Sequence, residues 1–526
     1  MAPRNLERSV MKSFQSAGFS LRPPAKAAIV SHLLAHEQAW QNELQTILRF
    51  FKENFERSVA VEEEHIRKAI GSRGRVVTGG ALGVPEIHVV SAFDIPRYRY
   101  DEAKRAFEKV ETLTKRQKVF ADGSMKTACV REHFALVKQR LLNHASFREA
   151  TLPFEDKARP KLTIISSLRD GEGTQYVLGM ISQMRVGRLF LEDLTGSIEL
   201  DLADISEDRQ TSGYFTEGSI VVVEGEVENG KLYAQSIGMP PAEERQAAIR
   251  ASSNTDFFLT LPPPNLVEGL KAEAEDASLL CLSDVWVDDD TAMAVFEEVL
   301  QGYSDHPNPS KLCFALLGNF TSPQDMAPTL DSVQKGMEKL AQIMKKYPSL
   351  CNESMWVFVP GPKDTVLTVA DVLPILPFHL QLQQPFARVL KHCVFASNPC
   401  RIRFFHREVL IFRYDTLRLF RRYSVLKPSS RESSDPQHHL LKTVLEQSHL
   451  CPFPLSRVSR YWELDHTLRT YPLPDSVILS QGTDSFSLKI EGCACASPGP
   501  LAAPLEKRGQ FIGYDPVSNA FDEYTL

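Results

Sequence analysis

The sequence lacks several signatures that would point directly to a chemistry or a compartment. None of its nine cysteines forms a CxxC pair, so neither a zinc-knuckle spacing nor a redox motif is present. No Gly-x-Ser-x-Gly elbow occurs, which excludes the nucleophile of an α/β hydrolase. No apolar run reaches the roughly 20 residues of a membrane span, and we expect no secretory signal in the charged N-terminus. Scattered cysteines, including the close pair Cys493 and Cys495, are typical of a reduced, intracellular protein.

Neither sign of charge dominates the chain. Its 60 Lys and Arg face 66 Asp and Glu, a formal net charge of −6, so we do not expect it to coat nucleic acid through bulk charge. Residues 97–148 are locally basic, with thirteen Lys or Arg against six Asp or Glu. Because no aromatic residues alternate with these cations at base-stacking spacing, we interpret the segment as a solvated helical hairpin packed on another domain. Contact with a nucleic-acid backbone is the alternative.

A length of 526 residues allows three or four domains. Apolar residues recur at helical spacing in the first 72 residues, and the period changes to that of strands from about 174. We predict a multidomain α+β fold. Its parts are an N-terminal four-helix docking bundle (1–75), a linker with an extended anchor and a basic helical segment (76–160), an OB-type barrel (161–245), a connector (246–275) and an α/β domain (276–526).

The barrel prediction rests on five short strands with two hairpin signals. Thr195-Gly196 and Asn229-Gly230 each separate two strand-like runs, and Asn-Gly is the strongest short hairpin signal in the chain. Five strands in about 70 residues suit a small closed barrel. Its strands carry many carboxylates, which favours contact with protein over contact with single-stranded DNA. These are Glu192, Asp193, Glu199, Asp201, Glu224, Glu226 and Glu228.

Two apolar runs further along predict buried strands that end in polar residues. LLCLSDV contains Asp284 near its end and is followed by Trp286, and KLCFALLGN ends at Asn319. Helical spacing between the runs completes a β-α-β pattern, which places Asp284 and Asn319 at the carboxyl ends of neighbouring strands, where open α/β sheets hold their sites. Residues 374–385, interrupted by prolines, are predicted to lack regular structure. The serine-rich residues 427–437 are predicted to form a mobile surface loop.

Taken in order, these segments resemble a known family. The motifs LSDVW, LLGNF, VPGPKD, NPCRI and LPDSVILS follow the FDIPRYRY anchor and the barrel sequence GMISQM…GRLFLEDLTGSIELDL. The series is similar, over nearly the whole chain, to the B-subunit family of replicative DNA polymerases and within it to the epsilon branch. The resemblance implies an α/β domain related to calcineurin-like phosphoesterases, a domain that is catalytically inactive in the eukaryotic members.

The residues themselves support an inactive site. The phosphoesterase pattern begins with Asp-x-His, where this chain keeps Asp284 but has Trp286, whose indole has no lone pair to give a metal. Its second motif, Gly-Asp, is Gly-Asn here, so the amide of Asn319 replaces a bridging carboxylate. The third motif, Gly-Asn-His, is reduced to residues 361–364, in which we expect Lys363 to bring positive charge toward any ion. A two-metal centre needs most of these ligands.

The closing Gly-His-x-His motif also has no counterpart, because residues 473–476 read LPDS. His449 is the best remaining ligand candidate, but we interpret it as a histidine satisfied by backbone near a helix end, since one imidazole cannot assemble a site. Asp288 to Asp290 are interpreted as a cap for a following helix. We therefore predict no catalytic, cofactor-binding or metal-binding residue. The alternative is a metal-dependent phosphodiesterase or nuclease rebuilt from Asp284, Asn319, Asp364 and His449.

The partners come from the resemblance alone. It implies that the barrel and the α/β domain hold the C-terminal region of the catalytic subunit of DNA polymerase epsilon, and that the N-terminal module links it to the replicative helicase through GINS. Small histone-fold subunits belong to the same implied complex, DNA is reached at most through that complex, and no membrane is involved. The implied location is the nucleus.

Overall fold

A computed structural model of the chain describes residues 3–17, 19–22, 25–26, 29, 44, 48, 60–61, 85–110, 121–147, 160–185, 187–325, 328–364, 372–502 and 509–526. The chain divides into two compact units, Met1–Val76 and Val77–Leu526. Among the described residues, no helix is both long and apolar enough to cross a bilayer.

The N-terminal unit begins with the predicted first helix. α1 (Pro3–Ser16) buries Val10 and Phe14 on one face. Strand β1 (Ser20–Leu21) pairs in parallel with β2 (Ala60–Val61), so the prediction of a helical bundle over residues 1–75 is wrong at these strands, where the β-branched Val61 fits the extended pairing. The other residues on which the four-helix bundle was predicted fall largely outside the described part of the chain.

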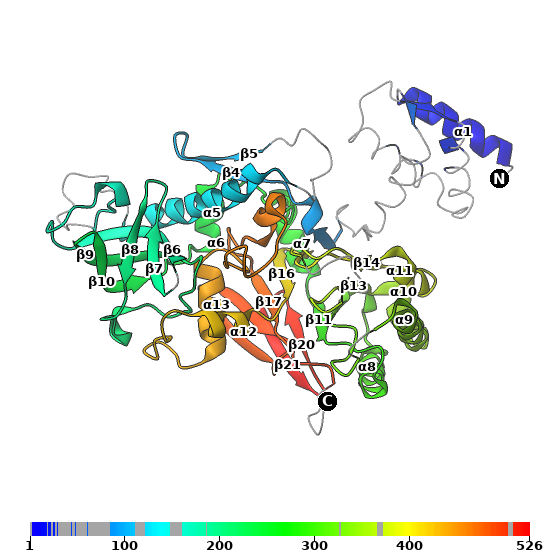
Figure 1. Ribbon diagram of the computed structural model, residues 1–526. Helices are drawn as coiled ribbons and strands as arrows, with labels where there is room; N and C mark the ends of the chain where they lie inside the picture. The colour runs from blue at the N-terminus through cyan, green and yellow to red at the C-terminus, as the bar shows by residue number, and fades with distance from the viewer. Residues whose placement is uncertain are drawn as a thin grey trace. The chain divides into compact units, whose positions relative to one another are not determined.

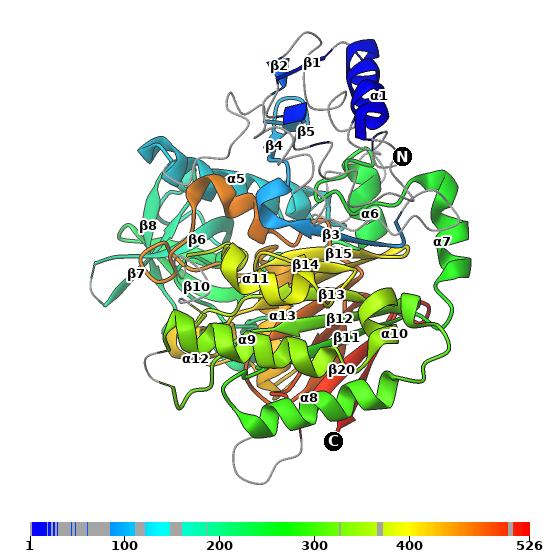
Figure 2. The same cartoon turned by 90° about the vertical axis from the view of Figure 1, so that its right-hand side faces the viewer.

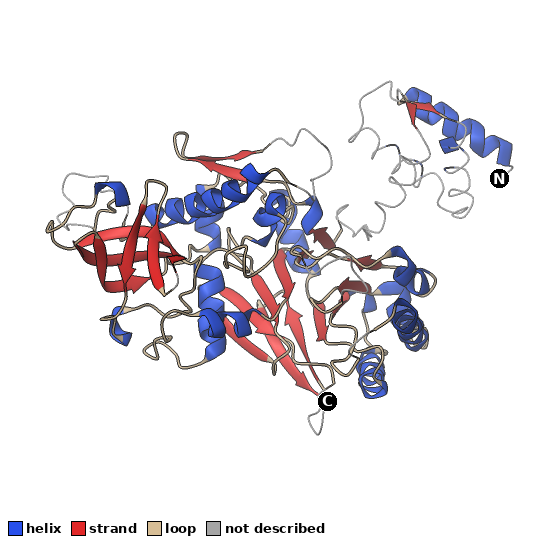
Figure 3. Ribbon diagram, in the orientation of Figure 1, coloured by secondary structure: helices blue, strands red, loops and turns tan. Residues whose placement is uncertain are grey.

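The second unit contains the predicted five-stranded closed barrel, with strand order β10-β8-β7-β6-β9 (Figure 3). Both hairpins are present, and at the second one Asn229 and Gly230 have φ of 52° and 72°, the left-handed pair that a two-residue type I′ turn requires. The strands are β6 (Gln175–Arg185), β7 (Arg188–Glu192), β8 (Ser197–Asp201), β9 (Ile220–Glu228) and β10 (Lys231–Gly238).

In its described residues, the basic segment before the barrel forms a β-hairpin and then a helix, which corrects the expected helical hairpin. Phe107 lies on a strand and packs edge-on to Phe257, 4.9 Å between ring centroids. Helix α5 (Gly123–Asn143) packs Phe134 and Leu141 against the barrel. The strands are β3 (Ile87–Ser91), β4 (Tyr98–Asp101) and β5 (Ala106–Lys109). β3 joins a sheet of the α/β domain by pairing with β15 (Cys400–Phe404), so the anchor begins one strand earlier than predicted.

The α/β part consists of two six-stranded sheets, with orders β14-β13-β12-β11-β20-β21 and β18-β19-β17-β16-β15-β3. Strands β11, β12 and β13 are parallel and buried along almost their whole length, which explains their continuous apolar sequences. The strands are β11 (Ser278–Ser283), β12 (Leu312–Leu317), β13 (Met355–Val359), β14 (Cys393–Phe395), β16 (Arg407–Arg413), β17 (Ser476–Ser480), β18 (Phe486–Ile490), β19 (Cys493–Ser497), β20 (Gln510–Asp515) and β21 (Ala520–Thr525).

Helices cover the outer face of each sheet, as Figures 1 and 2 show. On the first sheet they share a core with Phe314, Trp356 and Phe358, and on the second they pack on Leu410 and Phe412. The first group is α8 (Asp290–Tyr303), α9 (Leu330–Met344), α10 (Pro348–Glu353) and α11 (Leu380–Ala387); the second is α12 (Thr416–Tyr423) and α13 (Pro436–Glu446). Two short helices, α6 (Arg245–Ala251) and α7 (Val267–Glu273), lie in the connector.

Two predictions for this part are wrong. The apolar residues of the run CVFASNPCRIRFF (393–405) predict one strand, but the run forms β14 in the first sheet and β15 in the second. The proline-interrupted segment contains helix α11 with Pro385 inside it, because Leu382 and Phe386 pack into the core and so offset the cost of proline in a helix. The expected cap of α8 is present, since Asp289 accepts a hydrogen bond from the Ala292 amide.

Candidate functional site

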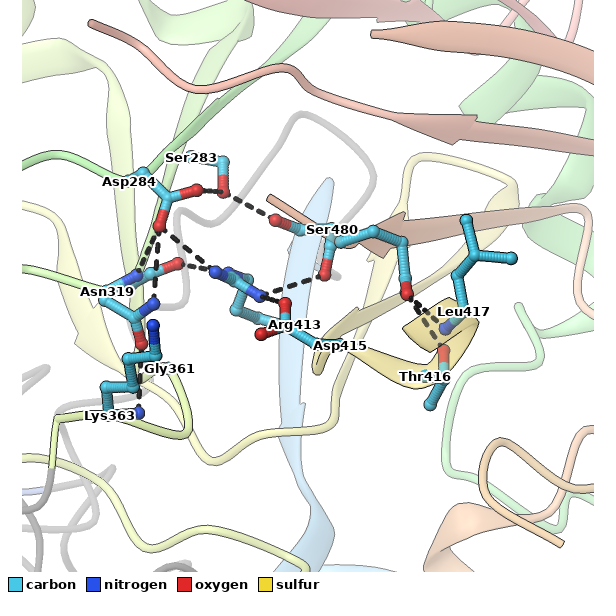
Figure 4. Close-up of polar contacts among 12 residues, drawn as sticks. Ser283, Asp284, Asn319, Gly361, Lys363, Arg413, Asp415, Thr416, Leu417 and Ser480 are labelled. Carbon is cyan, nitrogen blue, oxygen red and sulfur yellow. Dashed lines mark hydrogen bonds and ion pairs between the residues drawn. The ribbon is translucent and has the colours of Figure 1, made fainter. Parts of the chain in front are cut away.

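The carboxyl ends of strands from both sheets meet in one buried polar cluster (Figure 4). Asp284 and Asn319 follow β11 and β12, as predicted, and the segment with Asp364 follows β13. The second sheet contributes Arg413 at the end of β16 and Ser480 at the end of β17. The hydroxyls of Ser283 and Ser480 are 2.5 Å apart and join the two sheets directly. This is the edge at which the sequence placed a candidate site.

Asp284 is a saturated acceptor. It is 4% exposed, and its Oδ1 accepts hydrogen bonds from the Asn319 backbone nitrogen at 3.1 Å and from Arg413 Nη2 at 3.1 Å. The Ser283 hydroxyl lies 3.3 Å from Oδ2. The residue has a φ of 55°, a left-handed conformation that aspartate tolerates better than most residues. The carboxylate therefore faces its partners inside the protein.

Arg413 holds the centre of the cluster and was missed by sequence reasoning. Its guanidinium donates through Nε to the Gly318 carbonyl and through Nη1 to Asp415 Oδ1, both at 2.7 Å, in addition to the Asp284 contact. The side chain is 2% exposed. Burial alone lowers the pKa of this guanidinium, but the charges of Asp284 and Asp415 outweigh burial and raise it. A permanent cation thus sits among the carboxylates.

Asp364 joins its own loop, which follows β13, to the loop that follows β12. Its oxygens accept from the amide nitrogens of Phe320 at 2.8 Å and Gly361 at 2.7 Å. Burial raises the pKa of this carboxyl to about 7, although these hydrogen bonds lower it. The loops approach so closely that a side chain at Gly318 or Gly361 would overlap the other loop, which is why glycine occupies both positions.

Two residues predicted at the site play other parts. The Trp286 ring is buried with Ala292 and Ala502 in a small apolar cluster, away from the polar contacts. The side chain of Lys363 is exposed, and its backbone nitrogen donates to Asn319 Oδ1 at 3.0 Å. The expectation that Lys363 would bring charge to the site is therefore wrong. The positive charge comes from Arg413, because the end of its strand lies in the buried cluster.

His449 belongs to a different group of contacts. Its Nδ1 accepts from the Cys451 amide nitrogen at 2.9 Å, its Nε2 lies 3.4 Å from Asp465, and its ring is 5.1 Å from that of His133. Because it follows the end of α13, the interpretation as a backbone-satisfied histidine near a helix end is confirmed. The structure brings Asp284, Asn319 and Asp364 together and gives His449 other partners.

The LPDS motif also lies elsewhere. Asp475 precedes β17, at the end of the strand opposite to the cluster, and pairs with Arg245 at 3.2 Å and Arg407 at 3.1 Å. The strand contributes Ser480 to the cluster, through its hydroxyl to Ser283 and its carbonyl to Arg413 at 3.4 Å. Comparing motifs by their order along the chain could not reveal this, since only the register of β17 decides which residue reaches the cluster.

The residues present do not fit a two-metal centre. Such a centre needs carboxylate and imidazole lone pairs directed at a shared space, whereas the oxygens of Asp284 and Asp364 already accept from amide, hydroxyl and guanidinium groups. No group of three His, Cys, Asp or Glu able to hold a metal occurs in the portion of the chain that the structure describes. The cluster can therefore fix the two sheets together, but it offers no free nucleophile or ligand set.

Comparisons with known proteins agree with the motif order. The family model for the DNA polymerase alpha/epsilon B subunit matches residues 279–488, which contain the whole cluster. The model for the OB-fold domain of DNA polymerase epsilon subunit 2-like proteins matches residues 123–241, including α5 and the barrel.

Full-length relatives give the same picture. The chain is similar to the DNA polymerase epsilon B subunit of Arabidopsis thaliana, 31% identical over 97% of each chain. It is also 31% identical to DNA polymerase epsilon subunit 2 of Bos taurus, over 95% of each. A solved archaeal phosphodiesterase matches 47% of this chain and 99% of its own at a TM-score of 0.26 and 10% identity, a likeness too low to carry an argument.

Proposed function

This chain belongs to the family of DNA polymerase alpha/epsilon B subunits, and we propose that it is a non-catalytic accessory subunit of the DNA polymerase epsilon complex that scaffolds the catalytic subunit during chromosomal replication. The proposal gives it a nuclear location, as expected of a replicative polymerase subunit. It assigns no catalytic, cofactor-binding or metal-binding residue to the chain.

The observation that carries the non-catalytic part is the position of Arg413. Its guanidinium contacts Asp284, Asp415 and the Gly318 carbonyl at the edge where the resemblance to phosphoesterases would place metal ions. A fixed cation that is paired with carboxylates stabilises the fold but cannot coordinate water and lower its pKa as a metal ion does. The alternative, a rebuilt phosphodiesterase, is weakened further because His449 is paired with Asp465.

The scaffold part is supported by the tight connection between the barrel and the α/β domain. On α13, Thr443 accepts from the Tyr214 amide at 2.8 Å, and the next residue after the helix, Gln447, both accepts from and donates to the Ile220 backbone at 2.7 and 2.8 Å. Outside this helix, the Val425 backbone nitrogen donates a further hydrogen bond to the Phe215 carbonyl at 2.7 Å. Two domains joined in this way present one continuous surface to a partner.

We propose the following division of labour, with the domain limits given above. The barrel (161–245) and the α/β domain (276–526) bind the C-terminal region of the catalytic subunit, and residues 1–75 bind the replicative helicase through GINS. The small histone-fold subunits join through the complex. The separation of Met1–Val76 as its own compact unit supports an independent role for the N-terminal part.

A pull-down tests this division. The full chain and a variant that starts at Val77 are each incubated with the catalytic subunit and with the helicase. We expect the shortened chain to retain the catalytic subunit and to lose the helicase component. Loss of both partners, or retention of both, would contradict the proposal.

An activity assay tests the non-catalytic part. The purified chain is incubated with manganese and bis-p-nitrophenyl phosphate or single-stranded DNA, with metal analysis alongside. We expect no turnover and no stoichiometric metal. Turnover that disappears in Asp284→Ala would show that the rebuilt phosphodiesterase is correct.

A further inference from the structure

The segment that contains α12 carries an unbalanced charge. Between Thr416 and Arg431 the chain has five Lys or Arg and no Asp or Glu, in a protein whose net charge is −6. Most of these cations are arginines, the residue type whose planar fork suits phosphate oxygens. None of them belongs to the motifs that carry the family resemblance.

Helix α12 presents three of these arginines on one exposed stripe. Leu417 and Phe420 are buried in the core of the second sheet, which fixes the orientation of the helix. Arg418, Arg421 and Arg422 are exposed. Residues three and four apart on a helix lie about 5–6 Å from each other at Cβ, so Arg418 is a neighbour of both Arg421 and Arg422, and the three form one positive surface. Helix α12 itself lies beside α13 (Figure 1).

A fourth arginine reaches this surface from another segment. Arg457 lies 4.7 Å from the centroid of the Tyr423 ring, and Arg422 lies 5.5 Å from the same ring. A guanidinium held against an aromatic ring keeps its N–H edge available for hydrogen bonds while its conformational freedom is reduced. Both arginines are thereby oriented before any ligand arrives.

Some exposed cations elsewhere on this unit are paired with carboxylates. On α9 and just after it, Lys335, Lys339 and Lys346 pair with Asp331, Asp290 and Glu297. Within the described residues, no carboxylate forms an ion pair with Arg418, Arg421, Arg422 or Arg457, whereas nearby Arg413 and Lys427 have such pairs. Attraction to the negative end of the helix dipole can account for the presence of Arg421 and Arg422, which occupy the last turn of α12, but not for the other two arginines.

We propose that the α12 arginine surface, formed by Arg418, Arg421, Arg422 and Arg457, binds the phosphodiester backbone of nucleic acid. This inference goes beyond the scaffold role, because it gives the chain a direct and sequence-independent contact with DNA. Guanidinium forks match phosphate oxygens in pairs, and no feature of the surface reads base edges. The acidic barrel takes no part in it.

The test is binding of the full chain to fluorescein-labelled 30-residue DNA, single-stranded and duplex, by fluorescence anisotropy between 50 and 200 mM NaCl. We compare the wild type with R418Q/R421Q/R422Q. We expect the triple variant to bind about tenfold more weakly or worse, and its plot of log K against log salt for duplex to be shallower by about 2 to 3, since each lost phosphate contact removes about 0.9. The two DNA arms report whether one backbone form is preferred.

Two variants make the outcome specific. K335Q/K339Q/K346Q removes the same charge from lysines that are already paired, and should bind DNA as the wild type does. R418K/R421K/R422K keeps the charge and should keep the salt dependence. Thermal unfolding monitored by circular dichroism verifies that each variant is folded.

Several results would overturn the proposal. These are absence of wild-type binding at 50 mM NaCl, equal loss in the two glutamine variants, or an unchanged salt dependence in R418Q/R421Q/R422Q. Binding of polyglutamate as tightly as duplex DNA, with the same loss on substitution, would assign the surface to an acidic protein instead.

Discussion

At the scale of single residues, Arg413 explains why a site lacking most metal ligands still folds around its carboxylates. Asp284 and Asp364 are buried to 4% and 1% exposure, and buried carboxylates need a countercharge or hydrogen-bond donors. In a metal centre the ions would compensate them. Here a guanidinium and four backbone or side-chain donors compensate them. These contacts hold the strand ends of the two sheets together.

The substitution Arg413→Leu tests this role. It leaves Asp284 and Asp415 without their cation, and removing one partner of a buried ion pair costs about 3–5 kcal/mol. We expect the free energy of unfolding, measured by urea titration, to fall by about that amount. Arg418→Leu, on the exposed face of α12, serves as the control and should change it by about 0.5 kcal/mol or less. Equal losses in the two variants would contradict the role of Arg413.

At the scale of elements, α13 joins the barrel to the α/β domain. Its side chains form hydrogen bonds with the barrel backbone at Gly213 and Tyr214. Gln447, the residue after the helix, does the same at Ile220. The serine-rich segment before it, predicted to be mobile, is also attached to the barrel: Lys427 and Ser430 contact Glu207 at 3.0 and 2.8 Å. These contacts lower the pKa of Glu207 to about 2, with the Ser430 hydroxyl the largest cause.

Gln447→Met tests the junction. Gln447 is fully buried, and its loss leaves the Ile220 N–H and C=O without partners, at about 1–3 kcal/mol for each group. We expect the free energy of unfolding to fall by about 2–4 kcal/mol and hydrogen exchange to quicken in residues 216–222, read by mass spectrometry. Gln235→Met, on an exposed position of β10, is the matched control. Unchanged exchange in Gln447→Met would show that the junction does not depend on this side chain.

At the scale of the whole molecule, buried histidines should make the protein sensitive to acid. Burial lowers the pKa of His133 to about 3 and that of His466 to about 4. A histidine whose pKa is lower in the folded than in the unfolded state binds a proton more tightly when the protein is unfolded. Its contribution to the free energy of unfolding is therefore fully present above about pH 6.5 and is lost as the pH falls. Asp364 acts in the opposite sense. Its pKa is raised in the folded state, so its contribution to the free energy of unfolding is lost as the pH rises through about 7.

His466→Gln isolates one of these contributions. Glutamine can still donate to the Ile95 carbonyl, which His466 Nε2 contacts at 3.0 Å, but it does not titrate. Between pH 6.5 and 4, we expect the free energy of unfolding of the variant to fall less steeply than that of the wild type, by up to about 1.4 kcal/mol per pH unit. His379→Gln, at an exposed position, should leave the slope unchanged. Parallel pH profiles for the wild type and His466→Gln would contradict the prediction.

How much the sequence could predict differs between the parts of the fold. The barrel hairpins, the cap of α8 and the parallel strands β11, β12 and β13 follow local rules, such as the left-handed pair Asn229-Gly230, so they could be predicted. Helix α11 could not, because Pro385 argues against a helix locally and only the burial of Leu382 and Phe386 outweighs it. The division of the run CVFASNPCRIRFF between two sheets likewise depends on contacts distant in sequence.

The sequence by itself determined the family, the order of the barrel and the α/β domain, and the positions of Asp284 and Asn319 at two strand ends, because apolar periodicity and motif order are local properties. Only the tertiary structure decided what surrounds those residues. It places Arg413, which lies on a strand of the other sheet and 129 residues from Asp284 in the sequence, beside that carboxylate. It also leaves the side chain of Lys363 exposed and pairs His449 with Asp465. Pairing between distant strands sets which side chains share a buried space, and the need to compensate buried charge sets which of them must meet.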